Sequence, residues 1–330
     1  MSSPTVRDVA VAAGSSVSTV SRVLSGARAH DDDVARRIRR AAAELGYSAS
    51  VMARALRGEQ SLVTVIADDV GTETMGEIVF GMESAARVAG VLVTVSASGG
   101  DPRQRVAALR VLRSMRPRAV VLTGSWLDDA ELQQDLQTEL DAYTSRDGGR
   151  VVVIGGPRPP YTTIGFDDYG SALLVGEHMA NLGRTSALIL SGPPDHVAFQ
   201  ARTRAFAAAL KDAGIVDVRI APSAMTRDGA ATALAEALGG GTPGLVLAGN
   251  DVIALGALAE LRRRGTAVPA DVAVSGFDGI PFALDQHLGV TTVALPFARM
   301  GRMALALAID DEERAHKELR GHLVVRSTSG

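Results

Sequence analysis

The 330-residue sequence contains no cysteine and only 13 prolines. The absence of cysteine excludes disulfide bonds, thiolate metal sites and a cysteine nucleophile, and nothing in the composition points to an oxidising compartment. No apolar run approaches the roughly 18 residues that a membrane span requires. Arg7 and Asp8 also interrupt the N-terminal apolar residues before a signal-like core can form. We therefore expect a cytoplasmic protein that is neither exported nor inserted into a membrane.

Familiar catalytic motifs are missing as well. The sequence has no G-x-x-x-x-G-K-[ST] phosphate loop, no H-E-x-x-H zinc motif and no G-x-S-x-G nucleophile motif. Its six histidines show no metal-ligand spacing, and the glycine runs that begin at Gly99 and Gly239 are expected to be turns rather than phosphate cradles. We therefore expect neither an enzyme nor a bound metal or cofactor.

The net charge of −3 is distributed unevenly along the chain. Residues 1–60 contain nine arginines and six acidic residues, a net charge of +3, whereas residues 61–330 contain 25 basic and 31 acidic residues, a net charge of −6. A basic N-terminal segment on an acidic remainder is typical of a protein that binds nucleic acid through one end.

The first 47 residues predict a three-helix domain. One short helix ends at Gly14, a second starts after the N-cap residue Ser16, and a third begins near Asp33 and ends before Gly46. The expected inner faces of the three helices consist of Val6, Val9, Ala10, Ala13, Val20, Val23, Leu24, Val34, Ile38, Ala41, Ala42 and Leu45. Two short helices joined at a glycine turn are typical of the helix-turn-helix, whose second helix enters the major groove of DNA.

DNA contacts are therefore expected at the start of the second helix. Val17, Ser18 and Arg22 would face bases, because valine contacts a thymine methyl group, serine bonds several base edges and arginine bonds guanine bidentately. The hydroxyls expected to contact phosphates are those of Thr5, Ser16, Thr19 and Ser21. The arginines at 36, 37, 39 and 40 are expected to form a solvated helix face. A small helical bundle without DNA-binding function is the alternative interpretation.

These residues resemble the LacI/GalR (lactose/galactose repressor) family of bacterial transcription regulators. The similarity covers residues 5–10, 13–14, 18–24 and 43–47, and it continues through 53–56 into 60–61. The resemblance implies a hinge helix that forms on DNA and inserts Leu56 into the minor groove, with Ala53 in the same interface. Ala49 and Ser50 replace the usual Pro-Asn pair, which implies a less constrained hinge. Leu56 packed on protein is the alternative.

The remaining residues alternate between short β-branched runs and helical stretches, a pattern that predicts parallel strands connected by helices. The expected strands are 62–67, 91–96, 119–123, 151–154, 187–190, 218–221, 245–248 and 272–275, and expected helices include 79–89, 172–182, 199–213 and 252–264. These eight expected strands, with their connecting helices, are too many for a single open sheet of ordinary width. Two doubly wound lobes with a ligand cleft between them are the economical arrangement.

The same family resemblance extends over this region and implies a periplasmic-binding-protein-like effector domain. The matching segments are 165–170, 249–251, 254–256, 274–278 and 290–293. The resemblance assigns effector contacts to Arg202, Asn250, Asp278 and Phe297. Asp68 and Asp69, after the first strand, and Trp126, which could stack on a sugar, are further candidates, although Trp126 could equally be a packing residue. Arginine, asparagine and aspartate together suit vicinal hydroxyls or a nucleobase edge. The alternatives are a surface ion pair for Arg202 and turn or cap roles for Asp251 and Asp278.

We therefore predict a multidomain protein, with an all-α headpiece at 1–47, a hinge at 48–60 and an α/β effector-binding and dimerisation domain at 61–330. The first lobe is expected at about 61–160 and 292–321 and the second at about 161–291 and 322–330. The expected function is that of a repressor that binds a palindromic operator as a homodimer and responds to a sugar. A regulator of nucleoside or purine response, a solute-binding protein of a transporter and a nucleotide-dependent enzyme are the alternatives.

Overall fold

The computed structural model describes residues 4–24, 33–47, 62–99, 101–123, 130–155, 160–281, 289–310 and 316–330. Ala53, Leu56 and Trp126 lie outside these residues, and so does the predicted hinge. In the part of the chain that is described, no helix combines the length and apolarity needed to cross a membrane.

The headpiece contains the three predicted helices, α1 (Val6–Ala12), α2 (Val17–Leu24) and α3 (Asp33–Glu44). Their shared core is formed by Val9, Ala10, Ala13, Val20, Val23, Ala35, Ile38, Ala41 and Ala42. The predicted core of α3 differs from the observed one at two positions, Val34 and Leu45. Ala35 rather than Val34 is fully buried, and Leu45 is exposed because it lies beyond the last residue of the helix.

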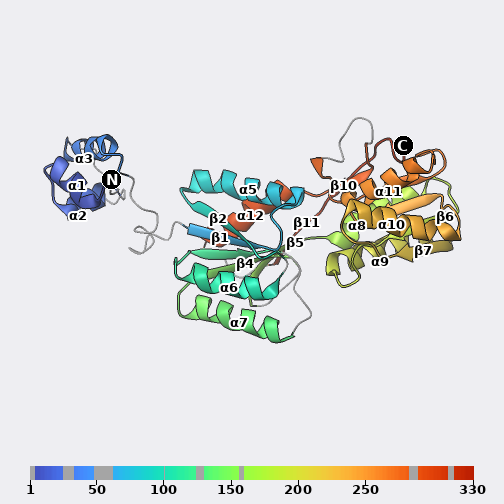
Figure 1. The fold of residues 1–330 in the computed structure, drawn as a ribbon, viewed down its shortest axis with the longest axis horizontal. Helices are drawn as coiled ribbons and strands as arrows, with labels where there is room; N and C mark the ends of the chain where they lie inside the picture. Colours follow the sequence, from blue (N-terminus) through green and yellow to red (C-terminus); the bar gives the residue numbers. More distant parts are fainter. Residues whose placement is uncertain are drawn as a thin grey trace.

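The first lobe is a parallel sheet of six strands among the described residues, in the order β11-β5-β4-β3-β1-β2. The strands are β1 (Leu62–Ala67), β2 (Leu92–Ala97), β3 (Ala119–Leu122), β4 (Arg150–Ile154), β5 (Thr162–Phe166) and β11 (His316–Leu319). Helices α5 (Glu73–Ala89) and α12 (Phe297–Ile309) cover one face, and α6 (Pro102–Arg113) and α7 (Ala130–Ser145) cover the other (Figure 1). Strands β1 and β3 are buried throughout, as expected for parallel strands covered on both faces.

The second lobe is a smaller parallel sheet in the order β7-β6-β8-β9. Its strands are β6 (Ser186–Leu190), β7 (Asp217–Ala221), β8 (Leu245–Ala248) and β9 (Ala273–Ser275). Its helices are α8 (Asp168–Ala180), α9 (Val197–Asp212), α10 (Arg227–Ala237) and α11 (Asp251–Arg263). Strands β10 (Thr292–Ala294) and β12 (His322–Val324) form a separate antiparallel pair beside this lobe.

The chain passes between the lobes at positions slightly different from those expected. Strand β5 belongs to the first sheet, so the outgoing crossing follows Phe166 rather than residue 160. On the return, Val293 and Leu295 still pack in the core of the second lobe, so the chain leaves that lobe after Leu295. Each strand predicted from residue pattern is present, with ends within one residue of the expected positions.

The glycine run at 239–241 forms a turn, as predicted. Gly239, Gly241 and Gly244 have the G-x-G-x-x-G spacing, but the segment follows α10 and precedes β8. A dinucleotide-binding motif instead follows a strand and opens a helix, so this segment is not one.

Candidate functional site

Ser16 organises the start of α2. Its hydroxyl oxygen accepts a hydrogen bond from the backbone N–H of Thr19 at 3.1 Å, which confirms the predicted N-cap. The Ser16 hydroxyl also lies 3.0 Å from that of Ser18 and 2.8 Å from that of Thr19. Three hydroxyls therefore gather at the N-terminus of α2, where the partial positive charge of the helix favours a phosphate.

Thr5 has a structural role that sequence reasoning missed. Its hydroxyl accepts from the backbone N–H of Asp8, and the Asp8 carboxylate accepts from the backbone N–H of Thr5 at 2.7 Å. These two bonds form a capping box that starts α1. The pKa of Asp8 is lowered first by the hydrogen bond from the backbone N–H of Thr5 and then by a bond that the Thr5 hydroxyl donates to the Asp8 carboxylate at 2.7 Å. The T-x-x-D pattern formed by Thr5 and Asp8 could have predicted this capping box from the sequence.

The residues predicted to face bases lie on the outer side of α2. Val17 is 44% exposed, Ser18 and Arg22 are exposed, and Ser21 is half-buried. The Arg22 Nε donates to the carbonyl oxygen of Ser18 at 3.3 Å, which holds the guanidinium along the N-terminal part of α2. Ser18 and Arg22 thus share one face of α2, with Ser16 and Val17 at its N-terminus and Arg22 in its last turn.

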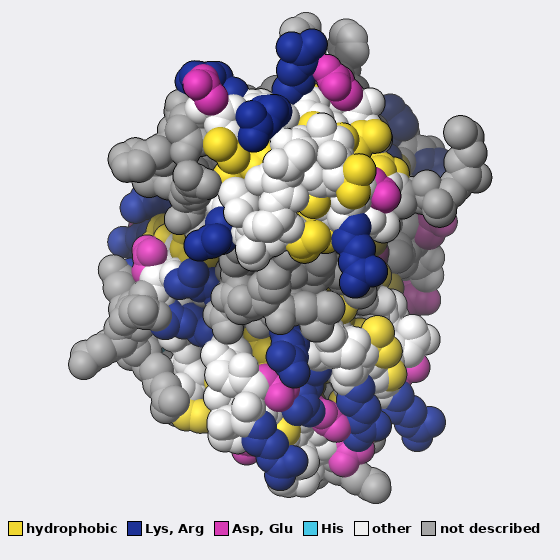
Figure 2. Space-filling model, turned by 90° about the vertical axis from the view of Figure 1, so that its left-hand side faces the viewer, with side chains coloured by type: hydrophobic (Ala, Val, Ile, Leu, Met, Phe, Trp, Pro, Cys, Tyr) yellow, Lys and Arg dark blue, Asp and Glu magenta, His cyan; other side chains and the backbone are white. Residues whose placement is uncertain are grey.

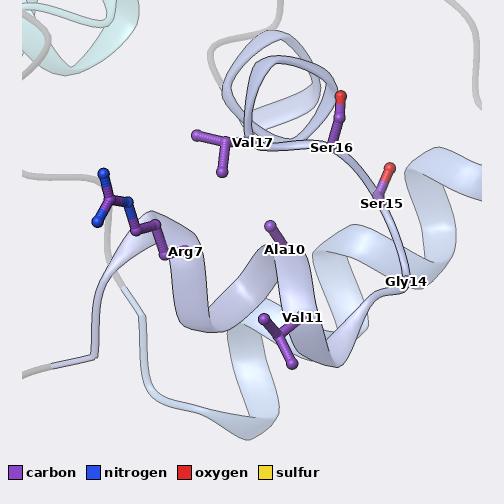
Figure 3. Close-up of a pocket in the computed structure, with 7 residues that line it drawn as sticks. All are labelled: Arg7, Ala10, Val11, Gly14, Ser15, Ser16 and Val17. Atoms are coloured by element: carbon purple, nitrogen blue, oxygen red, sulfur yellow. The ribbon is translucent and has the colours of Figure 1, made fainter.

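Figure 3 shows an open groove between α1 and α2, lined by Arg7, Ala10, Val11 and residues 14–17. The Arg7 side chain extends from α1 on the side toward which Val17 points, and Val11 is 83% exposed. Neither Arg7 nor Val11 was among the predicted DNA contacts. The exposure of these two residues could have been predicted from the sequence, because neither lies on the apolar face of α1 that packs in the headpiece core.

The arginines of α3 are only partly a solvated face. Arg36 pairs with Asp33 and Arg40 with Glu44, whereas the Arg37 Nε donates to the carbonyl oxygen of Ala13 at 2.9 Å. Arg37 therefore ties α3 to the end of α1, although it lies exposed like the other three arginines, as predicted. Seen from the headpiece side, Lys and Arg side chains are spread among acidic ones rather than gathered in one uniform patch (Figure 2).

The second candidate site centres on Arg202, which is buried in α9 of the second lobe. Its Nε donates to the Asp168 carboxylate at 2.8 Å, and its Nη1 donates to the carbonyl oxygen of Gly249 at 3.0 Å and lies 3.1 Å from the Asp278 carboxylate. The guanidinium carbon lies 4.0 Å from the ring centre of Phe277. Burial lowers the pKa of Arg202, but the charges of Asp278 and Asp168 outweigh burial and raise it.

Asn250 and Asp278 come to the same edge of the second sheet from different loops. Asn250 caps α11, and its side-chain oxygen accepts from the N–H of Ile253 at 2.9 Å. Asp278 follows β9 and adopts a φ of 105°, which non-glycine residues rarely adopt. Burial raises the pKa of Asp278 to about 6, although Arg202 opposes this shift. Of the three predicted residues, Arg202 and Asp278 are thus in direct contact, and Asn250 directly follows Gly249, whose carbonyl binds Arg202.

Asp251 holds the loop of residues 278–280 through hydrogen bonds to its backbone. Its Oδ2 accepts from the backbone N–H groups of Gly279 at 2.7 Å and Ile280 at 2.9 Å. These bonds support the alternative interpretation of Asp251 as a turn residue, whereas the cap of α11 is Asn250. Burial, followed by the charge of Asp278, raises the pKa of Asp251 to about 7.

The backbone of Asp278 is also joined to the chain segment that returns to the first lobe. Its N–H donates to the carbonyl oxygen of Val293 at 3.0 Å, and its carbonyl oxygen accepts from Leu295 at 3.0 Å. Two residues later Phe297 begins α12 and packs edge-on against Phe166, with ring centres 5.1 Å apart. Phe297 is half-buried between the cores of both lobes.

At the carboxyl edge of the first sheet, Asp69 is exposed, and its carboxylate accepts from the N–H of Gly71 at 2.7 Å. Its neighbour Asp68 pairs with the buried Arg105 and accepts from the Ser98 hydroxyl at 3.2 Å.

The sequence analysis did not name Asp168 and Phe277, the two residues that hold Arg202 in the second lobe. Both nevertheless lie in segments that carry the family resemblance.

The comparisons with known proteins agree with this architecture. Residues 5–50 match the model "Bacterial regulatory proteins, lacI family", and residues 177–329 match the model "Periplasmic binding protein-like domain". The repressor CytR of Escherichia coli (strain K12) is 28% identical over 317 residues, which cover 94% of this chain and 91% of CytR. The chain belongs to the lacI family of bacterial regulatory proteins.

Solved structures of lacI-family regulators resemble the whole chain. The lac repressor dimer bound to operator and the anti-inducer ONPF has a TM-score of 0.86 and 25% identity, and the match covers 99% of each chain. The regulator CelR in complex with cellobiose has a TM-score of 0.71 and 25% identity, and covers 98% of this chain and 99% of CelR.

Three predictions are thereby confirmed: the family, the fold of a helical headpiece with two α/β lobes, and a transcriptional regulator rather than an enzyme. This lacI-family protein is a DNA-binding transcriptional repressor with an effector domain. The individual DNA and effector contacts remain predictions.

Proposed function

We propose that this lacI-family repressor acts in the cytoplasm, binds an inverted-repeat operator as a homodimer, and is controlled by a sugar bound beside Arg202, Asn250 and Asp278. The DNA contacts proposed are Thr5, Ser16, Val17, Ser18, Thr19, Ser21, Arg22, Ala53 and Leu56. The proposed effector contacts are Asp69, Trp126, Arg202, Asn250, Asp278 and Phe297.

The convergence of Arg202, Asn250 and Asp278 is the observation that carries the proposal. A guanidinium, an amide and a carboxylate at one sheet edge supply both donors and acceptors, which suits the adjacent hydroxyls of a sugar. The carboxyl ends of parallel strands are also where α/β sheets of this kind bind ligands. A nucleoside or purine is the second candidate, because the same groups can bond a base edge.

A route from ligand to DNA follows from the backbone of Asp278. A ligand that moves Asp278 also moves residues 293–295, and this segment leads directly into α12. Helix α12 packs closely on α5, where Gly81 lies against the Ala298 backbone and Gly301 against that of Ile78. The ligand shifts the equilibrium only if its affinity differs between the DNA-competent and incompetent states, so both induction and corepression are open to this route.

Exposed apolar side chains on the first lobe support pairing through that lobe. Phe80 and Val88 on α5 are 64% and 90% exposed, and Leu92 and Val95 lie exposed on the adjacent edge strand β2. A twofold pairing of this face would align two headpieces with an inverted repeat.

The dimer is tested by light scattering of the full chain at micromolar concentration. We expect the mass of a dimer for the wild type and for Val111→Asp, which changes an equally apolar, exposed residue on the opposite face of the first lobe. Phe80→Asp is expected to shift the mass toward the monomer. A wild-type monomer with and without DNA would contradict the proposal.

The effector is tested by a thermal-shift panel of sugars, nucleosides and purines on the full chain, followed by a band shift with inverted-repeat DNA in the presence of each hit. A ligand at about 100 times its dissociation constant adds roughly 2.7 kcal/mol of stability. The shift should disappear in Arg202→Ala and persist in Arg204→Ala, which removes an exposed arginine from the same helix. A hit that survives Arg202→Ala would place the effector elsewhere.

A further inference from the structure

The charges around Arg202 do not balance. One guanidinium faces two carboxylates, Asp168 at 2.8 Å and Asp278 at 3.1 Å, so this cluster has one more negative than positive charge when all three groups are ionised. The buried Asp251 lies close enough to Asp278 for their charges to interact. The site is therefore negative at the place where the effector is expected.

Arg202 has little positive charge to offer a ligand. Its Nε and Nη1 already donate to Asp168 and to the Gly249 carbonyl, and its guanidinium carbon lies over two aromatic rings, 4.0 Å from the ring centre of Phe277 and 5.2 Å from that of Phe199. An anion could attract Arg202 only by drawing it away from its partner carboxylates, of which Asp278 is buried and would then lack a counter-ion. Arginine is thus used here to hold Asp168 and Asp278 in position.

Among the described residues, two helix N-termini and one histidine near Arg202 also contribute little positive charge. Helices α8 and α11 carry Asp168 and Asp251 in their first turns, so carboxylates already occupy the positive ends of both helix dipoles. The ring of His196 lies against Phe199, and burial and then the charge of Arg202 lower its pKa, so its imidazole is neutral near pH 7. In the first lobe, Arg105 is likewise paired with Asp68.

We propose that the effector site selects uncharged, hydroxyl- or amide-bearing ligands over phosphorylated or carboxylated ones, and that Asp168 sets this selectivity. The inference rests on the proposed effector function and narrows it. A unit negative charge about 6 Å from an uncompensated carboxylate, at an effective dielectric constant of about 20, corresponds to roughly 100-fold in the dissociation constant.

The test uses pairs of probes that differ in charge: glucose and glucose 6-phosphate, galactose and galacturonate, adenosine and adenosine monophosphate. Their affinities for the full chain are measured by calorimetry. In the wild type, the uncharged member of any pair that binds is expected to bind about 100-fold more tightly. In Asp168→Asn, which keeps the size and an acceptor oxygen, this ratio should fall by at least about tenfold. Asp212→Asn, the same change at the exposed end of α9, should leave the ratio unchanged.

The pH dependence supplies a second readout. The groups that face Asp278 are Arg202 on α9, Asp168 on α8 and Asp251 on α11, with His196 beside Arg202. Because the pKa of Asp278 is about 6, lowering the pH from 8 to about 5.5 removes negative charge from the site, and the preference for galactose over galacturonate should decrease. This pair is used because a phosphate monoester itself takes up a proton at a pH of about 6.

Each outcome separates the inference from the proposed function. Tighter binding of an anionic member would overturn the inference and leave the effector site in place. If the ratio of affinities for the uncharged and the charged probe were the same in Asp168→Asn and Asp212→Asn, Asp168 would not set the selectivity of the site. A wild-type chain that binds none of the probes would overturn the proposed sugar or nucleoside function, and the inference with it.

Discussion

Replacing Asp251 with asparagine should change how the stability of the effector domain depends on pH. Asp251 is fully buried at the start of α11, and its Oδ2 holds the 278–280 loop through the N–H groups of Gly279 and Ile280. Burial raises the pKa of its carboxyl from 3.8 to about 7. Asparagine keeps an oxygen that can accept from this loop but has no charge to desolvate.

The sign of the effect follows from proton binding. Between pH about 4 and about 7, native Asp251 holds a proton that the unfolded chain has released, so the free energy of unfolding falls as the pH rises. The slope is up to about 1.4 kcal/mol per pH unit, and the cumulative cost above pH 7 is about 4 kcal/mol. The Asn variant lacks this cost, so its stability relative to wild type should increase by about that amount between pH 4 and pH 8.

The assay is urea unfolding of the full chain, followed by circular dichroism at several pH values between 4.5 and 8. Wild type, Asp251→Asn and the exposed control Asp212→Asn are compared at each pH. A difference between wild type and Asp251→Asn that is the same at both ends of this range would refute the reasoning, because it would mean that Asp251 titrates alike in the folded and unfolded chain.

Three further changes test the DNA interface and the core. Arg22→Ala should weaken specific operator binding by about 1–3 kcal/mol in band shifts with matched and mismatched sites, and unchanged discrimination would remove Arg22 from the base-reading set. Ser16→Ala removes the N-cap of α2 and should cost about 0.5–2 kcal/mol of headpiece stability, measured by thermal unfolding. Gly301→Ala would press a methyl group into the Ile78 backbone and should destabilise the first lobe by about 1–3 kcal/mol, measured by urea unfolding. An unfolding midpoint equal to that of the wild type would show that α5 and α12 can separate without cost.

Much of the architecture follows from local sequence pattern. The apolar runs of β1 and β8 predict buried parallel strands, and the observed bounds agree with the prediction. Strands β5 and β11 were missed because Thr162–Phe166 and His316–Leu319 have little apolar alternation, and they become strands only by pairing with each other and with β4. That pairing also moved the lobe boundary from residue 160 to Phe166.

The residue types of both sites can be read directly from the amino-acid sequence: the capped α2 with Ser16 and Arg22, and the arginine, asparagine and aspartate expected beside a ligand. The hydrogen-bond partners of these groups, by contrast, depend on how distant segments of the chain pack together. Arg202 is separated from Asp168 and Asp278 by tens of residues, and its guanidinium could have reached solvent, a ligand or a carboxylate. Burial made the difference, because a buried cation requires a counter-ion, and the fold placed two carboxylates within its reach.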